Sequence, residues 1–297
     1  MPRVEIAVPF QDNWYFDAMT EGIAARLQEV DPTCTVSILA ERPGAPGRAV
    51  VADRFDEVLA DEDCVGAIAI GFEFKGPQVP RLTAHGKPVV VIGGWCDGLP
   101  SVTVDDERVA REATQHLLDL GHTTITHLAG YALSPDDFTM RTDRVRGYSE
   151  AMREAGLDEH SHVVPCEFTH EAAYRAAKEL LSDPVRPTAV FAVADELAFA
   201  VLEAAGDLGL EVPRDLSVVG VDDHRDAASR GLTTFRQDPA VVGGAAVDRL
   251  LGRTEADHQV LRCDLVERET TAAPRTPEAP RRSVLDRLLR RRSPAVG

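Results

Sequence analysis

Hydrophobic and polar positions follow two rhythms along the chain. Short apolar runs such as Val4 to Val8 and Pro88 to Ile92 are typical of β-strands, and longer segments between them have the apolar spacing of amphipathic helices. Several runs are apolar at consecutive positions, as Val89 to Ile92 is, which favours strands buried on both faces. The pattern therefore predicts parallel strands joined by crossover helices.

The predicted elements alternate from the first residues to beyond residue 220. Strands are expected at Val4 to Val8, Thr35 to Leu39, Gly66 to Ile70, Pro88 to Ile92, Thr124 to Leu128, His162 to Cys166, Ala189 to Val193 and Leu216 to Val221, with a last strand-like run at Val260 to Val266. Helices are expected at Phe16 to Val30, Arg108 to Leu120, Arg144 to Ala155, Glu171 to Leu181 and Glu196 to Leu208.

Ten or so strands are many for one sheet, and 297 residues are enough for two domains. Two doubly wound parallel-sheet lobes of the α/β class are therefore the simplest architecture. Ligands of such sheets bind at the carboxyl ends of the strands, which predicts a ligand cleft between the lobes.

Composition excludes several classes of protein. The 32 Lys and Arg against 49 Asp and Glu give a net charge of −17, so most of the surface would repel a nucleic-acid backbone. No apolar stretch approaches the ~18 residues of a membrane span, and no secretory signal precedes the first strand. A cytoplasmic location is the expectation. Five cysteines, far apart, are expected to be reduced thiols.

The composition changes near the C-terminus. Residues 275–297 contain seven Arg against two acidic residues, a net charge of +5, after a Pro-rich start. Arg281 to Arg292 could form a short basic helix with apolar residues on one face, or remain a frayed tail. An ordered helix could serve self-association or contact an anionic surface.

Signatures of the common enzyme classes are absent. The chain has no phosphate-binding loop, no dinucleotide-binding glycine motif, no nucleophile elbow and no zinc-protease motif. Asp222, Asp223 and His224 are adjacent after a strand, so their side chains diverge and do not make a metal site unaided. The chain is expected to be no enzyme and to use no cofactor and no metal.

Specific motifs appear in a fixed order in the middle and later parts of the chain. They are Val104-Asp105-Asp106, His116 to His122, Leu128-Ala129-Gly130, Pro187 to Ala192, Asp195-Glu196-Leu197-Ala198, Leu208-Gly209-Leu210, Asp215 to Gly220, Asp222-Asp223, and Leu232-Thr233-Thr234 with Gln237. Near the start, Pro9, Asn13 to Phe16 and Gly22 have the spacing of a family pattern in which Trp14 replaces a proline.

This succession resembles the effector-binding core of the LacI/GalR family of bacterial transcriptional regulators, over about residues 4–274. The resemblance implies the periplasmic-binding-protein-like type I fold and a sensor that closes its lobes on a small polar effector such as a sugar, a polyol or a nucleoside. Closure would then control DNA binding in a repressor. The helix-turn-helix headpiece that family members carry is not in this sequence, so DNA would be a partner only if one is supplied. The alternative is a stand-alone binding protein that never contacts DNA.

The resemblance assigns two charged residues to the cleft. Arg144 takes the place of the family's ligand-clamping arginine, with Arg141 as a rival because the preceding segment is longer than usual. A guanidinium can bridge two ligand oxygens. Asp222 falls where the family places a carboxylate that accepts hydrogen bonds from ligand hydroxyls or amines, with a structural cap as its alternative role.

The other candidate ligand-binding residues are Asn13, Trp14, Tyr15, Phe168, Asp195 and Gln237. By the same resemblance Phe168 would stack on the ligand, while Trp14 and Tyr15 would line the opposing lobe. Ala194 stands where the family usually has Asn, which weakens the expectation of a typical sugar. Trp95 lies either at the cleft edge or in packing.

The expected lobes are residues 1–130 with 236–257, and 131–235 with 258–274. Three chain crossings between them would form a hinge. Family members dimerise through these cores, so a homodimer is expected, and the tail adds the possibility of a tetramer.

Overall fold

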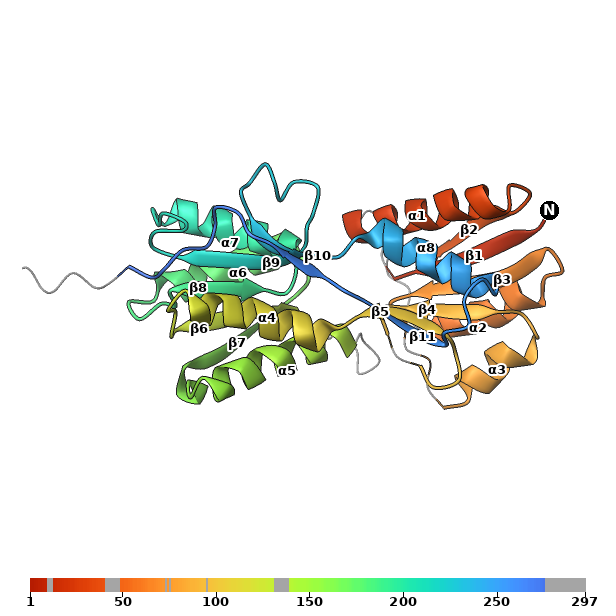
Figure 1. Cartoon of the computed structure of the whole chain (residues 1–297), viewed down its shortest axis with the longest axis horizontal. Helices are drawn as coiled ribbons and strands as arrows, with labels where there is room; N and C mark the ends of the chain where they lie inside the picture. Colours follow the sequence, from red (N-terminus) through yellow and green to blue (C-terminus); the bar gives the residue numbers. More distant parts are fainter. Residues whose placement is uncertain are drawn as a thin grey trace, which may run out of the picture.

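The computed structural model forms two lobes joined by crossing segments (Figure 1). It describes residues 1–9, 13–40, 49–72, 74, 76–94, 96–130 and 139–275, with the backbone alone for 40, 49–53 and 139–141. The basic tail expected at 281–292 lies outside the described residues. Each lobe contains one six-stranded sheet, which confirms the predicted α/β class with two mostly parallel sheets.

The first sheet has the strand order β11-β5-β4-β3-β1-β2, and its paired strands are parallel. Its strands are β1 (Arg3–Val8), β2 (Thr35–Ala40), β3 (Cys64–Ile70), β4 (Val89–Ile92), β5 (Ser101–Val104) and β11 (His258–Leu261). Helices α1 (Trp14–Val30) and α8 (Pro239–Leu250) cover one face, and α2 (Ala49–Ala60) and α3 (Gln78–Ala84) cover the other.

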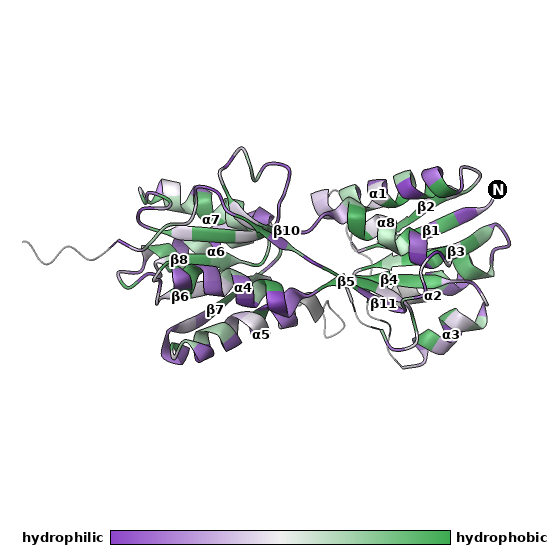
Figure 2. Ribbon diagram, in the orientation of Figure 1, coloured by the Kyte–Doolittle hydropathy of each residue, from purple (hydrophilic) through white to green (hydrophobic). Residues whose placement is uncertain are grey.

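Strand alternation explains how this sheet fills two cores. Val4, Ile6 and Val8 of β1 face the core under α1 and α8, whereas Ala7 faces the core under α2 and α3. Successive side chains of a strand point to opposite faces, so a run that is apolar throughout suits a sheet covered by helices on both sides. Figure 2 shows the apolar strands inside each lobe and the more polar outer surfaces of the helices.

The second sheet has the order β12-β10-β9-β8-β6-β7, with β12 antiparallel to β10 and the other pairs parallel. Its strands are β6 (Ile125–Gly130), β7 (Ser161–Cys166), β8 (Ala189–Ala192), β9 (Ser217–Asp222), β10 (Thr233–Arg236) and β12 (Asp264–Val266). Helices α4 (Asp106–Asp119) and α5 (Thr139–Glu154) cover one face, and α6 (His170–Ser182) and α7 (Asp195–Asp207) the other. A short 3-10 helix, η1 (Asp158–His160), precedes β7.

Three described segments cross between the lobes: β5 to α4 at Asp105, β10 to α8 at Gln237, and β11 to β12 at Arg262. The lobe boundaries expected from the sequence are therefore corrected. Helix α4 and β6 belong to the second lobe, so the first crossing lies near residue 105 and not near 130. Short β5 was not predicted, and the run Val260 to Val266, predicted as one strand, is two short strands in different sheets.

Of the helices that the structure describes, none combines the length and the apolarity that crossing a membrane demands.

Helices α1 and α8 approach closely because each has a glycine that faces the backbone of the other helix. A Cβ at Gly243 would lie 2.7 Å from the carbonyl oxygen of Met19, and one at Gly22 would lie 2.5 Å from the Cα of Ala240. Neither backbone can yield without moving a whole helix, so the glycines set the distance between the helices.

The first prediction uses two neighbouring glycines of α8. Gly243→Ala places a methyl group against the Met19 backbone and should lower the free energy of unfolding by about 1–3 kcal/mol. Gly244→Ala is the matched control, since its Cβ meets only the Arg26 side chain at 3.7 Å, and a helical Ala should raise stability by up to ~1 kcal/mol. Urea unfolding measures both, and equal effects of the two substitutions would contradict the close approach.

Candidate ligand-binding site

Arg144 is the centre of a buried polar cluster beside the first crossing. Its side chain lies on α5 and is 1% exposed. The Nε donates to Asp106 Oδ1 at 2.8 Å, Nη2 lies 2.8 Å from the same oxygen, and Nη1 donates to the carbonyl oxygen of Val193. A buried charge is tolerated only when it is paired and hydrogen-bonded, so these contacts fix the guanidinium at the carboxyl end of β8.

Gly147 brings Arg144 to its partner. This residue lies one turn after Arg144 on α5, and any Cβ there would clash with the carbonyl oxygen of Glu107 on α4. Glu107 follows Asp106 in the sequence, so the absence of a side chain at Gly147 lets α5 approach the start of α4 where the carboxylate is. The ion pair therefore depends on a glycine that makes no polar contact itself.

Asp222 ends β9 with an unusual backbone. Its φ is 124° and that of Asp223 is 52°, values that non-glycine residues rarely adopt and that cost about 1–3 kcal/mol each. The Asp222 Oδ1 accepts a hydrogen bond from Gln237 Nε2, and Gln237 Oε1 accepts one from the Tyr15 hydroxyl at 3.1 Å. A hydrogen-bonded chain therefore runs from α1 of the first lobe, through a crossing segment, to β9 of the second.

Burial dominates the electrostatics of this cluster. It raises the pKa of Asp106 to about 6 although the Arg144 guanidinium opposes it, and it raises the pKa of Asp222 to about 7 against Arg144 and Gln237. Burial lowers the pKa of Arg144, but the charges of Asp106 and Asp222 outweigh it and raise that pKa above its ordinary value. Burial and the Asp222 charge also raise the pKa of the Tyr15 hydroxyl well above its usual range.

Asp195 is fully buried at the start of α7, and both oxygens of its carboxylate accept hydrogen bonds from other residues of the chain. Its Oδ2 accepts the His224 N–H at 2.8 Å, and its Oδ1 accepts the Thr234 hydroxyl at 2.7 Å. A Cβ at Gly220 would clash with this carboxylate. Asp195 therefore holds the segment after β9 in place.

The other predicted residues occupy different surroundings. Asn13 and Trp14 contact the second lobe at Glu196 and His224. Phe168 follows β7 and packs, half-buried, against the core under α6 and α7. The structure thus brings Tyr15, Arg144, Asp222 and Gln237 into one cluster. The side chains of Arg141 and Trp95 lie outside the described part of the chain.

Sequence reasoning assigned no site role to Asp106, Glu196 and Cys263. The signal for Asp106 was present, since it belongs to the Val104-Asp105-Asp106 motif, but only the packing of α5 shows its partner. Cys263 lies near Arg144 on the third crossing, and burial raises the pKa of its thiol to about 12, so it stays protonated. Among the residues that the structure describes, no three His, Cys, Asp or Glu side chains gather as metal ligands.

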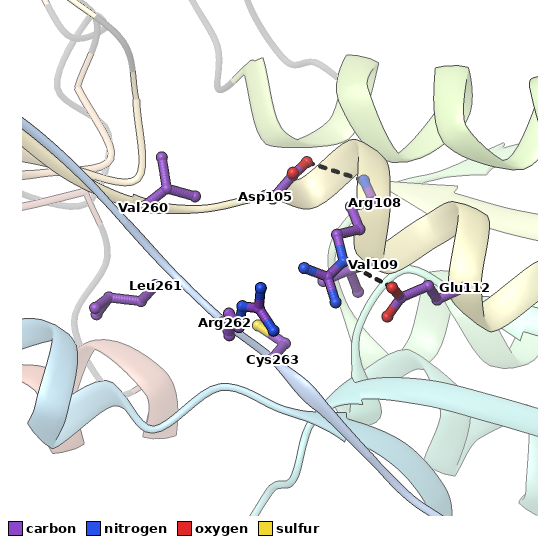
Figure 3. A pocket seen from close by; sticks show the side chains of 8 residues that line it. All are labelled: Asp105, Arg108, Val109, Glu112, Val260, Leu261, Arg262 and Cys263. Atoms are coloured by element: carbon purple, nitrogen blue, oxygen red, sulfur yellow. Dashed lines mark hydrogen bonds and ion pairs between the residues drawn. The ribbon is translucent and has the colours of Figure 1, made fainter.

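A groove of about 120 Å³ lies between the start of α4 and the third crossing (Figure 3). Its lining comes from the start of α4 and from the third crossing: Asp105, Arg108, Val109, Glu112, Val260, Leu261, Arg262 and Cys263. Within it, Arg108 Nε donates to Glu112 at 2.6 Å, and Asp105 caps α4 by accepting the Arg108 N–H at 3.0 Å. Of these two consecutive residues, Asp105 therefore lines the groove, and Asp106 pairs with Arg144.

The chain is similar to known proteins in sequence and in structure. Residues 114–271 match the family model of the periplasmic binding protein-like domain. The chain is 36% identical over 190 residues to catabolite control protein A of Priestia megaterium, a match that covers 63% of this chain and 56% of that protein. It is 31% identical over 289 residues to the HTH-type transcriptional regulator MalR of Streptomyces coelicolor, covering 91% of this chain and 80% of MalR. The chain thus spans only about half the length of the first of these relatives.

Solved structures agree with this likeness. A LacI transcriptional regulator from a Rhodococcus species superposes with a TM-score of 0.79 at 28% identity, over 92% of this chain and 100% of that one. The complex of the transcriptional regulator CelR with cellobiose superposes with a TM-score of 0.73 at 28% identity, over 90% of this chain and 84% of that one.

The second prediction concerns the buried carboxyl of Asp222. The folded protein keeps its proton up to about pH 7, while the unfolded chain releases it near pH 4, so the stability that this proton contributes is lost as pH rises between those values. Asp222→Asn keeps the oxygen that accepts from Gln237 and abolishes this titration. The difference in free energy of unfolding, variant minus parent, should therefore increase from pH 4 to 7, by at most ~1.4 kcal/mol per pH unit.

Denaturant unfolding at several pH values measures that difference. Asp223→Asn is the control, because Arg268 and Arg236 lower the pKa of Asp223 although its partial burial opposes them. For this variant the difference in free energy of unfolding should therefore decrease as pH rises, and do so at lower pH. A difference that stays flat between pH 4 and 7 for Asp222→Asn would contradict the buried, protonated carboxyl.

Proposed function

Since this chain belongs to the LacI/GalR family of transcriptional regulators, we propose that its two lobes bind a small, polar, sugar-like effector at the Arg144 and Asp222 cluster. The observation that carries the proposal is the convergence of three structural parts on this cluster. Tyr15 comes from the first lobe, Arg144 and Asp222 come from the second, and Gln237 on a crossing segment joins them.

The free hydrogen-bonding capacity of the cluster suits a polyhydroxylated ligand. Asp222 Oδ1 is used by Gln237, and among the described residues Oδ2 accepts no hydrogen bond, so it is available to a ligand hydroxyl. The guanidinium of Arg144 has five N–H groups in a fixed plane and can donate to ligand oxygens while it remains paired with Asp106. The cellobiose bound by CelR supports a sugar-like effector here.

Three other predicted residues enter the proposal, each in a different role. Phe168 offers an aromatic face for the apolar side of a sugar ring, and Tyr15 orients Gln237 and, through it, Asp222. Asp195 has both oxygens engaged and no exposed surface, so its proposed role is to hold the segment that carries Asp222.

Binding would act on transcription through the relative position of the lobes. A ligand that binds the closed arrangement 100-fold better than the open one supplies ~2.7 kcal/mol of coupling. This energy would reach a DNA-binding headpiece, which this sequence does not contain and which would have to be supplied, and a second copy of the chain in a homodimer. In this proposal the protein acts in the cytoplasm and releases its ligand unchanged.

The third prediction tests the ligand cluster. A thermal-shift screen of sugars, polyols and nucleosides should yield a ligand that stabilises the protein, by ~2.7 kcal/mol at 100 times its Kd. Asp222→Asn should then weaken binding at least tenfold when calorimetry is done above pH 7, because the carboxyl is ionised there and the amide lacks that charge.

Asp223→Asn is the matched control for this measurement. Its carboxylate pairs with Arg236 at 2.6 Å and with Arg268 at 2.5 Å, so its loss should leave the Kd within about threefold. Unchanged affinity of Asp222→Asn for every ligand found would remove Asp222 from the site, and chemical turnover of the ligand would replace the proposal with an enzyme.

A further inference from the structure

Three consecutive residues at the start of α1 each reach a different element beyond their own lobe. Asn13 Nδ2 donates to both carboxylate oxygens of Glu196, at 3.2 and 3.1 Å, near the start of α7. The ring of Trp14 packs on that of His224, with centroids 4.4 Å apart, and the Tyr15 hydroxyl reaches Gln237. The start of α1 is thus a concentrated contact between the lobes.

The first-lobe half of this contact is fixed by the helix itself. Asn13 is the N-cap of α1, and its Oδ1 accepts the N–H groups of Tyr15 at 3.1 Å and Phe16 at 3.3 Å. These bonds orient the amide so that its Nδ2 is directed to Glu196. One side chain therefore both starts the helix and bridges the lobes, and Trp14 follows it as the first helical residue.

The second-lobe half is fixed independently of the first lobe. The ring Nδ1 of His224 accepts the backbone N–H of Asp226 at 3.0 Å. The backbone N–H of His224 donates to the Asp195 carboxylate. The His224 ring meets Phe199 edge-on, with centroids 5.2 Å apart and planes at 82°, and the Arg230 guanidinium lies 4.5 Å from the Phe199 centroid on its face. His224 is 8% exposed. The surface that receives Trp14 is therefore held by contacts within the second lobe.

We propose that Asn13 and Trp14, in contact with Glu196 and His224, form an interlobe latch that holds the two lobes together before any ligand binds. Asn13 and His224 are held by contacts inside their own lobes, so these two side chains lose little conformational freedom when the lobes meet. The latch sets the resting position of the lobes, which the proposed function leaves open.

The latch can be measured on ligand-free protein. The chain has two tryptophans, so Trp95→Phe leaves Trp14 as the single fluorescent probe. In this background Glu196→Ala removes the partner of Asn13 without touching the Trp14 ring. The acrylamide quenching constant of Trp14 should rise at least twofold, and the radius of gyration from small-angle X-ray scattering should increase, because the lobes separate.

Glu203→Ala on the same helix is the matched control. Its carboxylate lies at the surface, 3.1 Å from His170, and its loss should change neither reading. Trp14→Pro is a second test, since proline is favoured at the first helical position and the extended backbone of Asn13 (φ −115°, ψ 124°) suits a residue before proline. This variant should also increase the radius of gyration while its circular dichroism stays that of the parent.

An unchanged quenching constant in folded Glu196→Ala, together with an unchanged radius of gyration in both Glu196→Ala and Trp14→Pro, would overturn the latch. Because no ligand is present, that result leaves the proposed effector site standing. Conversely, an effector site disproved by calorimetry leaves the latch measurement unaffected.

Discussion

The buried ion pair between Arg144 and Asp106 is the constraint on which the functional region depends. It ties the start of α4 to α5, and the same guanidinium holds the carbonyl of Val193 at the end of β8. Removing one partner of such a pair leaves an uncompensated buried charge and typically costs about 3–5 kcal/mol. The protein therefore keeps a cation at the carboxyl ends of the second sheet, next to Asp222.

Much of the fold followed from the sequence, because strands such as Val89 to Ile92 are buried on both faces and carry an unbroken apolar signal. The lobe boundaries did not follow. Strand β5 has four residues, and the third crossing at Arg262 divides what the sequence pattern predicts as one strand-like run. Such short strands form because a neighbouring strand pairs with them. The local pattern of hydrophobic residues carries no information about that neighbour.

The candidate site was predictable in part, for a similar reason. Arg144 and Asp222 belong to motifs that the chain shares with a family, so the resemblance indicated them. Asp106 could be found only from the packing of Gly147 against α4, and Glu196 only from its contact with Asn13, 183 residues away in sequence. Asp195 shows the converse, since the carboxylate of this motif residue accepts hydrogen bonds from a backbone N–H and a hydroxyl of the protein itself.

The order of the chain has a consequence for biosynthesis. Helix α8 and β11 complete the first lobe, yet they follow the whole run from α4 to β10 in the sequence. During synthesis on the ribosome, the face of α1 that carries Met19 and Ile23 lacks its packing partner until α8 has been translated. The lobe that is begun first is thus still incomplete when most of the second lobe has been made, and premature release of the nascent polypeptide would leave an apolar surface for chaperones to bind.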